Sequence, residues 1–317
     1  MVSKSIRYLT WFVVVATAIA TCQQQPPPTI QERLGYPASA RLLIIHADDV
    51  GMFHSVNRAT FEALEKGWIT SASILVPCPW FPEAARWARA HPQADLGLHL
   101  ALTSEWTDVR WGPVAPADKV PSLLDQDGYL YLDTPMLAHV KMPEVETELR
   151  SQIERARTAG VRFTHLDTHM AALASSPELF TVYQRLGREY NVPILSEKGE
   201  TFRVPPGVSL ADNEMLVQKV IGMEPGIDRK DWLKWYENAL APLPPGVYQL
   251  IVHLGYDDEE IQGATWNHPD WGAAWRQSDF DMVRSPEFQS FLRDQKLRLI
   301  RWSDLQKIAS RFRAASR

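Results

Sequence analysis

The chain has 317 residues, a length within reach of a single α/β barrel of about 250 residues. Its 45% hydrophobic and 22% charged residues exclude a disordered, collagenous or coiled-coil chain. The net charge of -5, without a block of Lys and Arg, argues against a nucleic-acid partner, and two cysteines cannot build a disulfide framework or a cysteine-rich zinc site.

The N-terminus has the layout of a secretory signal. Lys4 and Arg7 precede an apolar run of 13 residues, 8–20, which is shorter than the about 20 residues of a transmembrane helix. Cys22 follows, at the position where a bacterial lipoprotein carries its lipid. We therefore expect a signal peptide at 1–20, a Gln/Pro-rich spacer at 21–40, and export to the periplasm or cell envelope. The exported form is either a plain secreted protein or a lipoprotein anchored to the membrane through Cys22, and the alternative is an uncleaved N-terminal anchor.

From residue 41 onward, short apolar runs alternate with amphipathic stretches, the pattern of βα units around a parallel sheet. We predict strands at 42–47, 73–76, 96–100, 161–166, 192–195, 248–253 and 297–302. We predict helices at 55–66, 82–90, 143–159, 177–190, 231–240 and 286–295. Seven strands without an evident linker predict one irregular TIM-barrel-like (β/α) domain over 41–317.

Two stretches interrupt this alternation. Residues 103–141 are rich in proline and contain Trp106 and Trp111, and residues 255–281 contain three tryptophans, Trp266, Trp271 and Trp275. Long loops of this kind are usually lids or binding loops. Exposed tryptophans there suit stacking on sugar rings, and the alternative is that they pack the loops against the barrel.

Carboxylates and imidazoles follow four of the predicted strands. Asp48 and Asp49 end the first, and the others are followed or ended by His99, by Asp167 with His169, and by His253. A parallel barrel places its reactive side chains at the carboxyl ends of its strands. These residues are therefore predicted to meet at one rim.

An adjacent pair of aspartates at the end of an apolar strand is costly unless a cation balances the charge. Two histidines and one carboxylate from separate strands make a metal site that leaves coordination positions open, as a catalytic metal requires. The second aspartate can then accept a proton from water, which predicts metal-assisted hydrolysis. Taken singly, the aspartates could instead cap a helix and each histidine could be an ordinary rim residue.

Two residues near His169 have alternative roles in this pattern. His165, Asp167 and His169 alternate along one strand, so that they share a face. His165 and Asp167 are expected either to support the ligands from behind or to contact substrate, with support the favoured interpretation for His165. His46 lies inside the first strand and is expected to be structural.

Five motifs in this order resemble those of the YdjC-like carbohydrate deacetylases, also called the chitooligosaccharide and hopanoid-sugar deacetylase family. They are residues 45–51, 67–73, 97–103, 164–169 and 252–253, and the likeness extends to 120–128 and 298–305. The resemblance covers most of the chain from 41 to 305. Two departures are Met170 in place of the usual histidine-rich run and Leu254 in place of the usual proline.

The resemblance implies a TIM-barrel-like fold and a metal-dependent hydrolase that removes acetyl groups from N-acetylated sugars or oligosaccharides. It implies Asp49, His99 and His169 as ligands of one divalent metal ion, Mg or Zn. It further implies Asp48 as the base and His253 as the general acid. Two other functions stay open at this point: a non-haem iron oxidoreductase, which the same ligand set would suit, and a carbohydrate-binding envelope protein without turnover.

Overall fold

The computed structural model describes residues 27–211, 214 and 217–315. The predicted signal peptide, Cys22 and the first part of the predicted spacer lie outside the described residues. The rest of the spacer contains a short helix, α1 (Ile30–Arg33), whose first turn is closed by reciprocal hydrogen bonds between Thr29 and Glu32. Gln31 is buried, and Ile30 packs against a core cluster of the domain. This part of the spacer therefore belongs to the folded domain.

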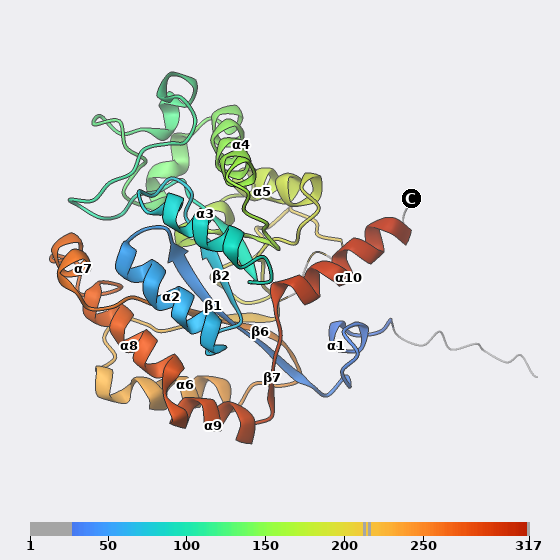
Figure 1. The fold of residues 1–317 in the computed structure, drawn as a ribbon. Coiled ribbons are helices and arrows are strands. Elements are labelled where there is room, and N and C mark those ends of the chain that lie inside the picture. The colour runs from blue at the N-terminus through green and yellow to red at the C-terminus, as the bar shows by residue number, and fades with distance from the viewer. Residues whose placement is uncertain (1–26, 212–213, 215–216, 316–317) are drawn as a thin grey trace, which may run out of the picture.

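A parallel sheet forms the centre of the molecule (Figure 1). In the described part of the chain it has seven strands: β1 (Arg41–Val50), β2 (Ser71–Ile74), β3 (Leu96–Leu100), β4 (Leu166–Thr168), β5 (Lys219–Gly222), β6 (Gly246–Val252) and β7 (Leu297–Leu299). Their order is β4-β3-β2-β1-β6-β5, with β7 paired to the first residues of β1. β1 is buried along almost its whole length, as expected of a parallel strand covered on both faces.

The sheet is curled but is not a fully closed barrel. Its two edges, β4 and β5, share no ladder within the described residues. Single bridges, Leu166 with Ile194 and Glu197 with Val217, partly fill the space between them. The prediction of an α/β fold with a barrel-like parallel sheet is thus confirmed. A complete TIM barrel is not confirmed.

Helices surround this sheet, and α2, α4 and α8 contact β1, β3 and β6, respectively. The helices after α1 are α2 (His54–Lys66), α3 (Phe81–Ala90), α4 (Met142–Thr158), α5 (Pro177–Glu189), α6 (Trp232–Leu240), α7 (Glu259–Ala264), α8 (Ala273–Arg284), α9 (Pro286–Asp294) and α10 (Trp302–Ala315). All six predicted helices are present with ends shifted by a residue or so. Every helix in the described part falls short of the length and apolar character that crossing a membrane requires.

Four predicted strands are wrong in extent. The strand predicted at 73–76 is β2, which lies two residues earlier. Of residues 161–166, only Leu166 belongs to a strand, and 192–195 contribute only the bridge at Ile194. The last predicted strand ends at Leu299, because Trp302 begins α10. These apolar side chains are buried for packing, which produces a strand-like pattern without a ladder.

The two interrupting stretches differ from each other. Residues 103–141, between β3 and α4, contain short 3-10 helices at Ala117–Lys119, Pro121–Leu123 and Thr134–His139. Residues 255–281 contain α7 and most of α8, so their prediction as a loop is wrong. In Figure 1 the arrowhead of β1 points toward the green segment 103–141, and the orange α7 lies toward the same end of the sheet, beyond α2. Both stretches therefore border the carboxyl end of β1.

Most tryptophans of these stretches pack inward. Trp106, Trp111 and Trp275 are buried. Trp271 is 39% exposed and Trp266 is 71% exposed. The packing interpretation is thus confirmed for three of them, and two stay available to solvent.

Candidate metal centre and active site

The register of the strands brings the predicted site residues to one level of the sheet. Ala47 of β1 pairs with Val252 of β6, so that Asp48 and His253 follow side by side. In the half of the sheet on the opposite flank of β1, His99 of β3 pairs directly with Asp167 of β4. The predicted meeting of these residues at the carboxyl ends of the strands is what the structure shows.

Asp49, His99 and His169 form a compact buried group. Asp49 Oδ1 lies 3.5 Å from His99 Nε2 and 3.5 Å from His169 Nδ1. One possible ligand atom from each residue falls within 4.8 Å of the others. Asp49 has a φ of 70°, a left-handed conformation that is uncommon for a residue with a side chain and often marks a functional site.

The unpaired ligand atoms of this group suit a divalent cation. Asp49 Oδ1 is buried and accepts no hydrogen bond from the described residues. A buried carboxylate oxygen without a partner, facing two imidazole nitrogens, is a donor set typical of zinc and other transition-metal sites, and its carboxylate also suits magnesium. The three residues predicted as metal ligands therefore fit that role.

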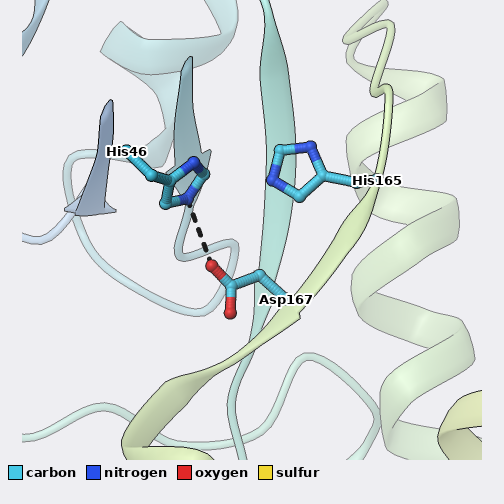
Figure 2. A group of neighbouring side chains, drawn as sticks. All are labelled: His46, His165 and Asp167. Atoms are coloured by element: carbon cyan, nitrogen blue, oxygen red, sulfur yellow. Dashed lines mark ion pairs between the residues drawn. The ribbon is translucent and has the colours of Figure 1, made fainter. Parts of the chain in front are cut away.

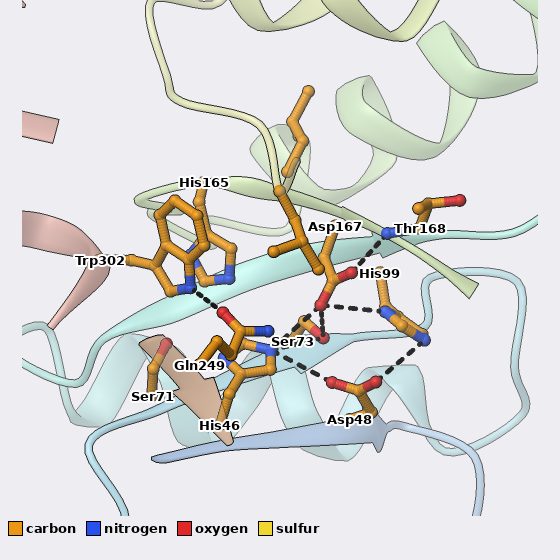
Figure 3. A network of polar contacts seen from close by, with 12 residues as sticks. His46, Asp48, Ser71, Ser73, His99, His165, Asp167, Thr168, Gln249 and Trp302 are labelled. Atoms are coloured by element: carbon orange, nitrogen blue, oxygen red, sulfur yellow. Dashed lines mark hydrogen bonds and ion pairs between the residues drawn. The ribbon is translucent and has the colours of Figure 1, made fainter. Parts of the chain in front are cut away.

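His99 is oriented by Asp167. His99 Nδ1 lies 3.4 Å from Asp167 Oδ2, and Nε2, on the far side of the ring, lies 3.9 Å from Asp48 Oδ2 (Figure 3). The same Nε2 lies 3.5 Å from Asp49 Oδ1. Burial works against the charge of Asp167, but His99 and His46 outweigh it and hold the pKa of this carboxyl well below its usual range. A carboxylate behind a ligating histidine fixes its tautomer and ring orientation. Asp167 therefore lies behind His99, the position that one of its two predicted roles, support of the ligands, requires.

His169 is oriented by Glu105, which the sequence analysis did not single out. Glu105 Oε2 lies 2.8 Å from His169 Nε2, so that Nδ1 faces Asp49. Burial alone would lower the pKa of His169, but Glu105 and Asp49 raise it to about 10. Glu105 comes from the stretch 103–141, which carries no periodic pattern that could have pointed to it.

A buried arginine was also missed. Arg276, in α8, is only 1% exposed, and its Nη2 lies 2.7 Å from Asp49 Oδ2. Although burial opposes ionisation of Asp49, Arg276 keeps the pKa of this carboxyl well below its usual range. The guanidinium is held in place by a hydrogen bond from Nε to the carbonyl of Trp271. Arg276 therefore favours the ionised form of Asp49.

Asp48 has the opposite electrostatic setting. Burial and the neighbouring carboxylates of Asp167 and Asp49 raise its pKa well above the usual range. Its Oδ1 lies 3.3 Å from His46 Nε2 and its Oδ2 lies 4.0 Å from His253 Nε2. A carboxylate with a raised pKa beside a metal-type site is suited to accept a proton.

His253 completes the group from β6. Its Nε2 lies 4.0 Å from Asp48 Oδ2 and 4.0 Å from Asp49 Oδ2, and 21% of its side chain is exposed. Burial lowers its pKa to about 3, so the imidazole is neutral. Its backbone N–H donates to Asp279 Oδ2 at 2.8 Å, and Tyr236 donates to the other oxygen at 2.6 Å. These contacts fix the end of β6 and hence the position of the imidazole.

A second layer of buried polar groups lies beneath the site. His46, His165 and Asp167 are near neighbours, and His46 Nε2 lies 3.1 Å from Asp167 Oδ2 (Figure 2). The ring of His165 stacks on Trp302 with centroids 4.7 Å apart. A Cβ on Gly97 would lie 2.3 Å from His165 Nε2, so glycine is needed there.

This lower layer also meets the distance criterion for a metal group. Its carboxylate, however, is already shared, since Asp167 Oδ2 also accepts a hydrogen bond from Ser73 and faces His99 (Figure 3). We therefore interpret His165 and His46 as support for the upper group. The ring of His165 meets the ring of His46 edge-on, with centroids 5.0 Å apart.

The fold and site together define an α/β protein with a buried Asp-His-His group able to hold a metal, flanked by a carboxylate and an imidazole. The family model of the YdjC-like proteins matches residues 42–294, and the chain belongs to this family. A carbohydrate deacetylase of Thermus thermophilus is 35% identical over 269 residues, covering 82% of this chain and 92% of the relative. A carbohydrate deacetylase of Brevibacillus brevis is 28% identical, covering 83% and 99% of the two chains.

A solved structure agrees with the fold. The crystal structure of a proposed cellobiose-phosphate cleavage protein from Enterococcus faecalis superposes with a TM-score of 0.70 at 24% identity. The match covers 84% of this chain and 99% of that one. At this identity the likeness supports the fold alone.

Proposed function

We propose that this protein is a metal-dependent hydrolase that removes the acetyl group from N-acetylated sugars or oligosaccharides. The observation that carries the proposal is the convergence of Asp49, His99 and His169 on one buried point, with Asp48 and His253 beside it. The curated relatives named carbohydrate deacetylases support the substrate class.

Asp49, His99 and His169 would hold one divalent cation, Mg or Zn. Bound there, the cation supplies Lewis acidity for hydrolysis of the acetyl amide. The chain's own contribution is a fixed donor set: Glu105 and Asp167 each contact one imidazole, and Arg276 binds Oδ2 of Asp49, the oxygen that does not face the histidines.

Asp48 and His253 move the protons in this proposal. Asp48 accepts a proton from the water that attacks the acetyl carbonyl, and the water oxygen leaves in acetate. His253 is neutral in the resting site, so the proton that it delivers to the departing amine first comes from Asp48. The 4.0 Å separation of Asp48 Oδ2 and His253 Nε2 has to shorten for this transfer.

We further propose that the protein acts outside the cytoplasm. The support is the basic residues and apolar run before Cys22, followed by the Gln/Pro-rich spacer. A lipid on Cys22 would anchor the domain to a membrane through this spacer. N-acetylated glycan fragments in the periplasm or outside the cell are then the substrates we expect.

The experiment is acetate release from a panel of N-acetylated saccharides by the purified protein, with and without chelator. We expect release from at least one saccharide, its loss with chelator, and its recovery when Zn or Mg is added back. The variant His99→Ala should be inactive under all three conditions. Release that persists unchanged in chelator would contradict the metal-dependent reaction.

A further inference from the structure

The two long stretches 103–141 and 255–281 are joined to each other by side-chain hydrogen bonds. Trp266 donates from its indole Nε1 to Asp108 Oδ2 at 2.7 Å, and Asn267 donates to Thr107 at 2.8 Å. Next to these bonds, His268 packs edge-on against the buried Trp106, with ring centroids 4.9 Å apart. Residues 106–108 and 266–268 thus form one continuous surface built from both stretches.

Trp266 is the most exposed large hydrophobic side chain of the described residues, at 71%. Its hydrogen bond to Asp108 nevertheless fixes the orientation of the ring. An exposed indole gains nothing from core packing, and fixing it in place costs side-chain entropy. A pre-oriented aromatic face next to polar groups is the arrangement that favours a flat, partly apolar ligand.

This surface is tied to the candidate metal ligands through both stretches. Asp108 lies three residues after Glu105, which contacts His169, so their Cα atoms are at most about 11 Å apart. Trp106 lies under the guanidinium of Arg276, which binds Asp49. A saccharide of a few units can span such a distance, so that one of its rings can lie on the indole while another lies at the metal site.

We propose that Trp266 is a stacking platform for a sugar ring of an oligosaccharide whose acetylated unit lies at the metal site. The apolar face of the sugar lies on the indole, and its hydroxyl groups meet Asp108 and Asn267. This inference rests on the proposed function and adds to it a preference for oligosaccharides over monosaccharides. Asp108 is the positioning residue, since it holds the indole from the opposite stretch.

The test compares N-acetylglucosamine with its tetramer as substrates of wild type, Trp266→Ala and Trp266→Phe. We expect Trp266→Ala to lower kcat/KM for the tetramer about tenfold more than for the monomer, through KM. Trp266→Phe keeps an aromatic face and should fall between. Tyr129→Ala is the matched control: Tyr129 is an exposed aromatic residue at 39% in the stretch 103–141, outside this surface, and its removal should leave the ratio at the wild-type value.

Binding is measured separately, by calorimetry of the tetramer with the inactive His99→Ala protein, with and without Trp266→Ala. We expect weaker binding in the double variant by a similar factor. An equal loss of kcat/KM for monomer and tetramer, or no change in kcat/KM or in tetramer binding, would overturn the assignment of Trp266 as a stacking platform. If wild type released no acetate from any saccharide while tetramer binding still depended on Trp266, the proposed reaction would fail and the platform would stand.

Discussion

Arg276 and Asp49 form a buried ion pair at 2.7 Å in which one oxygen of the carboxylate is engaged and the other faces two histidines. The guanidinium therefore balances the charge of Asp49 when no metal is bound. It does so from α8, a helix 227 residues further along the chain.

The first prediction follows from this pair. Arg276→Met removes the balancing charge and leaves the buried carboxyl group of Asp49 without its partner, which destabilises the metal-free protein by about 3–5 kcal/mol. Added Zn or Mg restores that balance, so the rise in Tm on metal addition should be larger in Arg276→Met than in wild type. Thermal unfolding in chelator and in metal measures both. Equal metal-induced shifts in the two proteins would contradict the charge-balancing role.

The second prediction concerns the effect of Glu105 on the proton that His169 releases when a metal binds. His169, with its pKa raised to about 10, is protonated in the metal-free protein at pH 8, and a metal on Nδ1 has to displace that proton. Wild type should release this proton on binding metal. Glu105→Gln removes a main cause of the raised pKa, so it should release fewer protons and bind metal about 10- to 100-fold more weakly. Calorimetry in two buffers of different ionisation enthalpy counts the protons, and an unchanged count in the variant would refute the assignment.

The third prediction separates the two adjacent aspartates. Asp48→Asn should keep the metal but lower turnover by roughly 10²- to 10⁴-fold, because an amide cannot accept the proton of water. Since the pKa of Asp48 is raised, its charge is unfavourable in the folded state, and the variant should be at least as stable as wild type above neutral pH. Acetate release and thermal unfolding are the measurements. Near-wild-type turnover would exclude Asp48 as the base.

The fourth prediction is a pH dependence of stability. Burial raises the pKa of Asp279 to about 7, so the folded state binds its proton more tightly than the unfolded state does. The contribution of protonated Asp279 to the free energy of unfolding is therefore present at low pH and is lost as the pH rises from about 4 to about 7. Relative to Asp279→Asn, wild type should lose about 3 kcal/mol between pH 4.5 and pH 7.5. Urea unfolding of both proteins at the two pH values tests this, and a constant difference would contradict it.

The sequence was informative where side chains directly follow strands. Asp48, Asp49, His99 and His253 could be placed at one rim because the carboxyl ends of parallel strands share an edge. Asp167 and His169 lie at the end of the short strand β4, and the period-2 spacing indicated which of them share a face.

Glu105 and Arg276 could not be found in this way. Each comes from a long interruption of the βα pattern, where position in the fold depends on tertiary packing and not on periodicity. The same reason explains the missed strand β5 (Lys219–Gly222). It is a short edge strand with an exposed Lys219 and a terminal Gly222, so its sequence lacks the apolar run of a central strand.

The most direct test of the central claim is metal content per chain, measured by elemental analysis after removal of metal and reloading with Zn or Mg. We expect one ion per chain in wild type and in Asp48→Asn. We expect less than about one tenth of that in His99→Ala and His169→Ala, because a three-residue site loses most of its affinity when one ligand is removed. Circular dichroism of each variant confirms that the fold persists. An unchanged metal content in the folded His99→Ala and His169→Ala proteins would contradict the assignment of Asp49, His99 and His169 as the metal site.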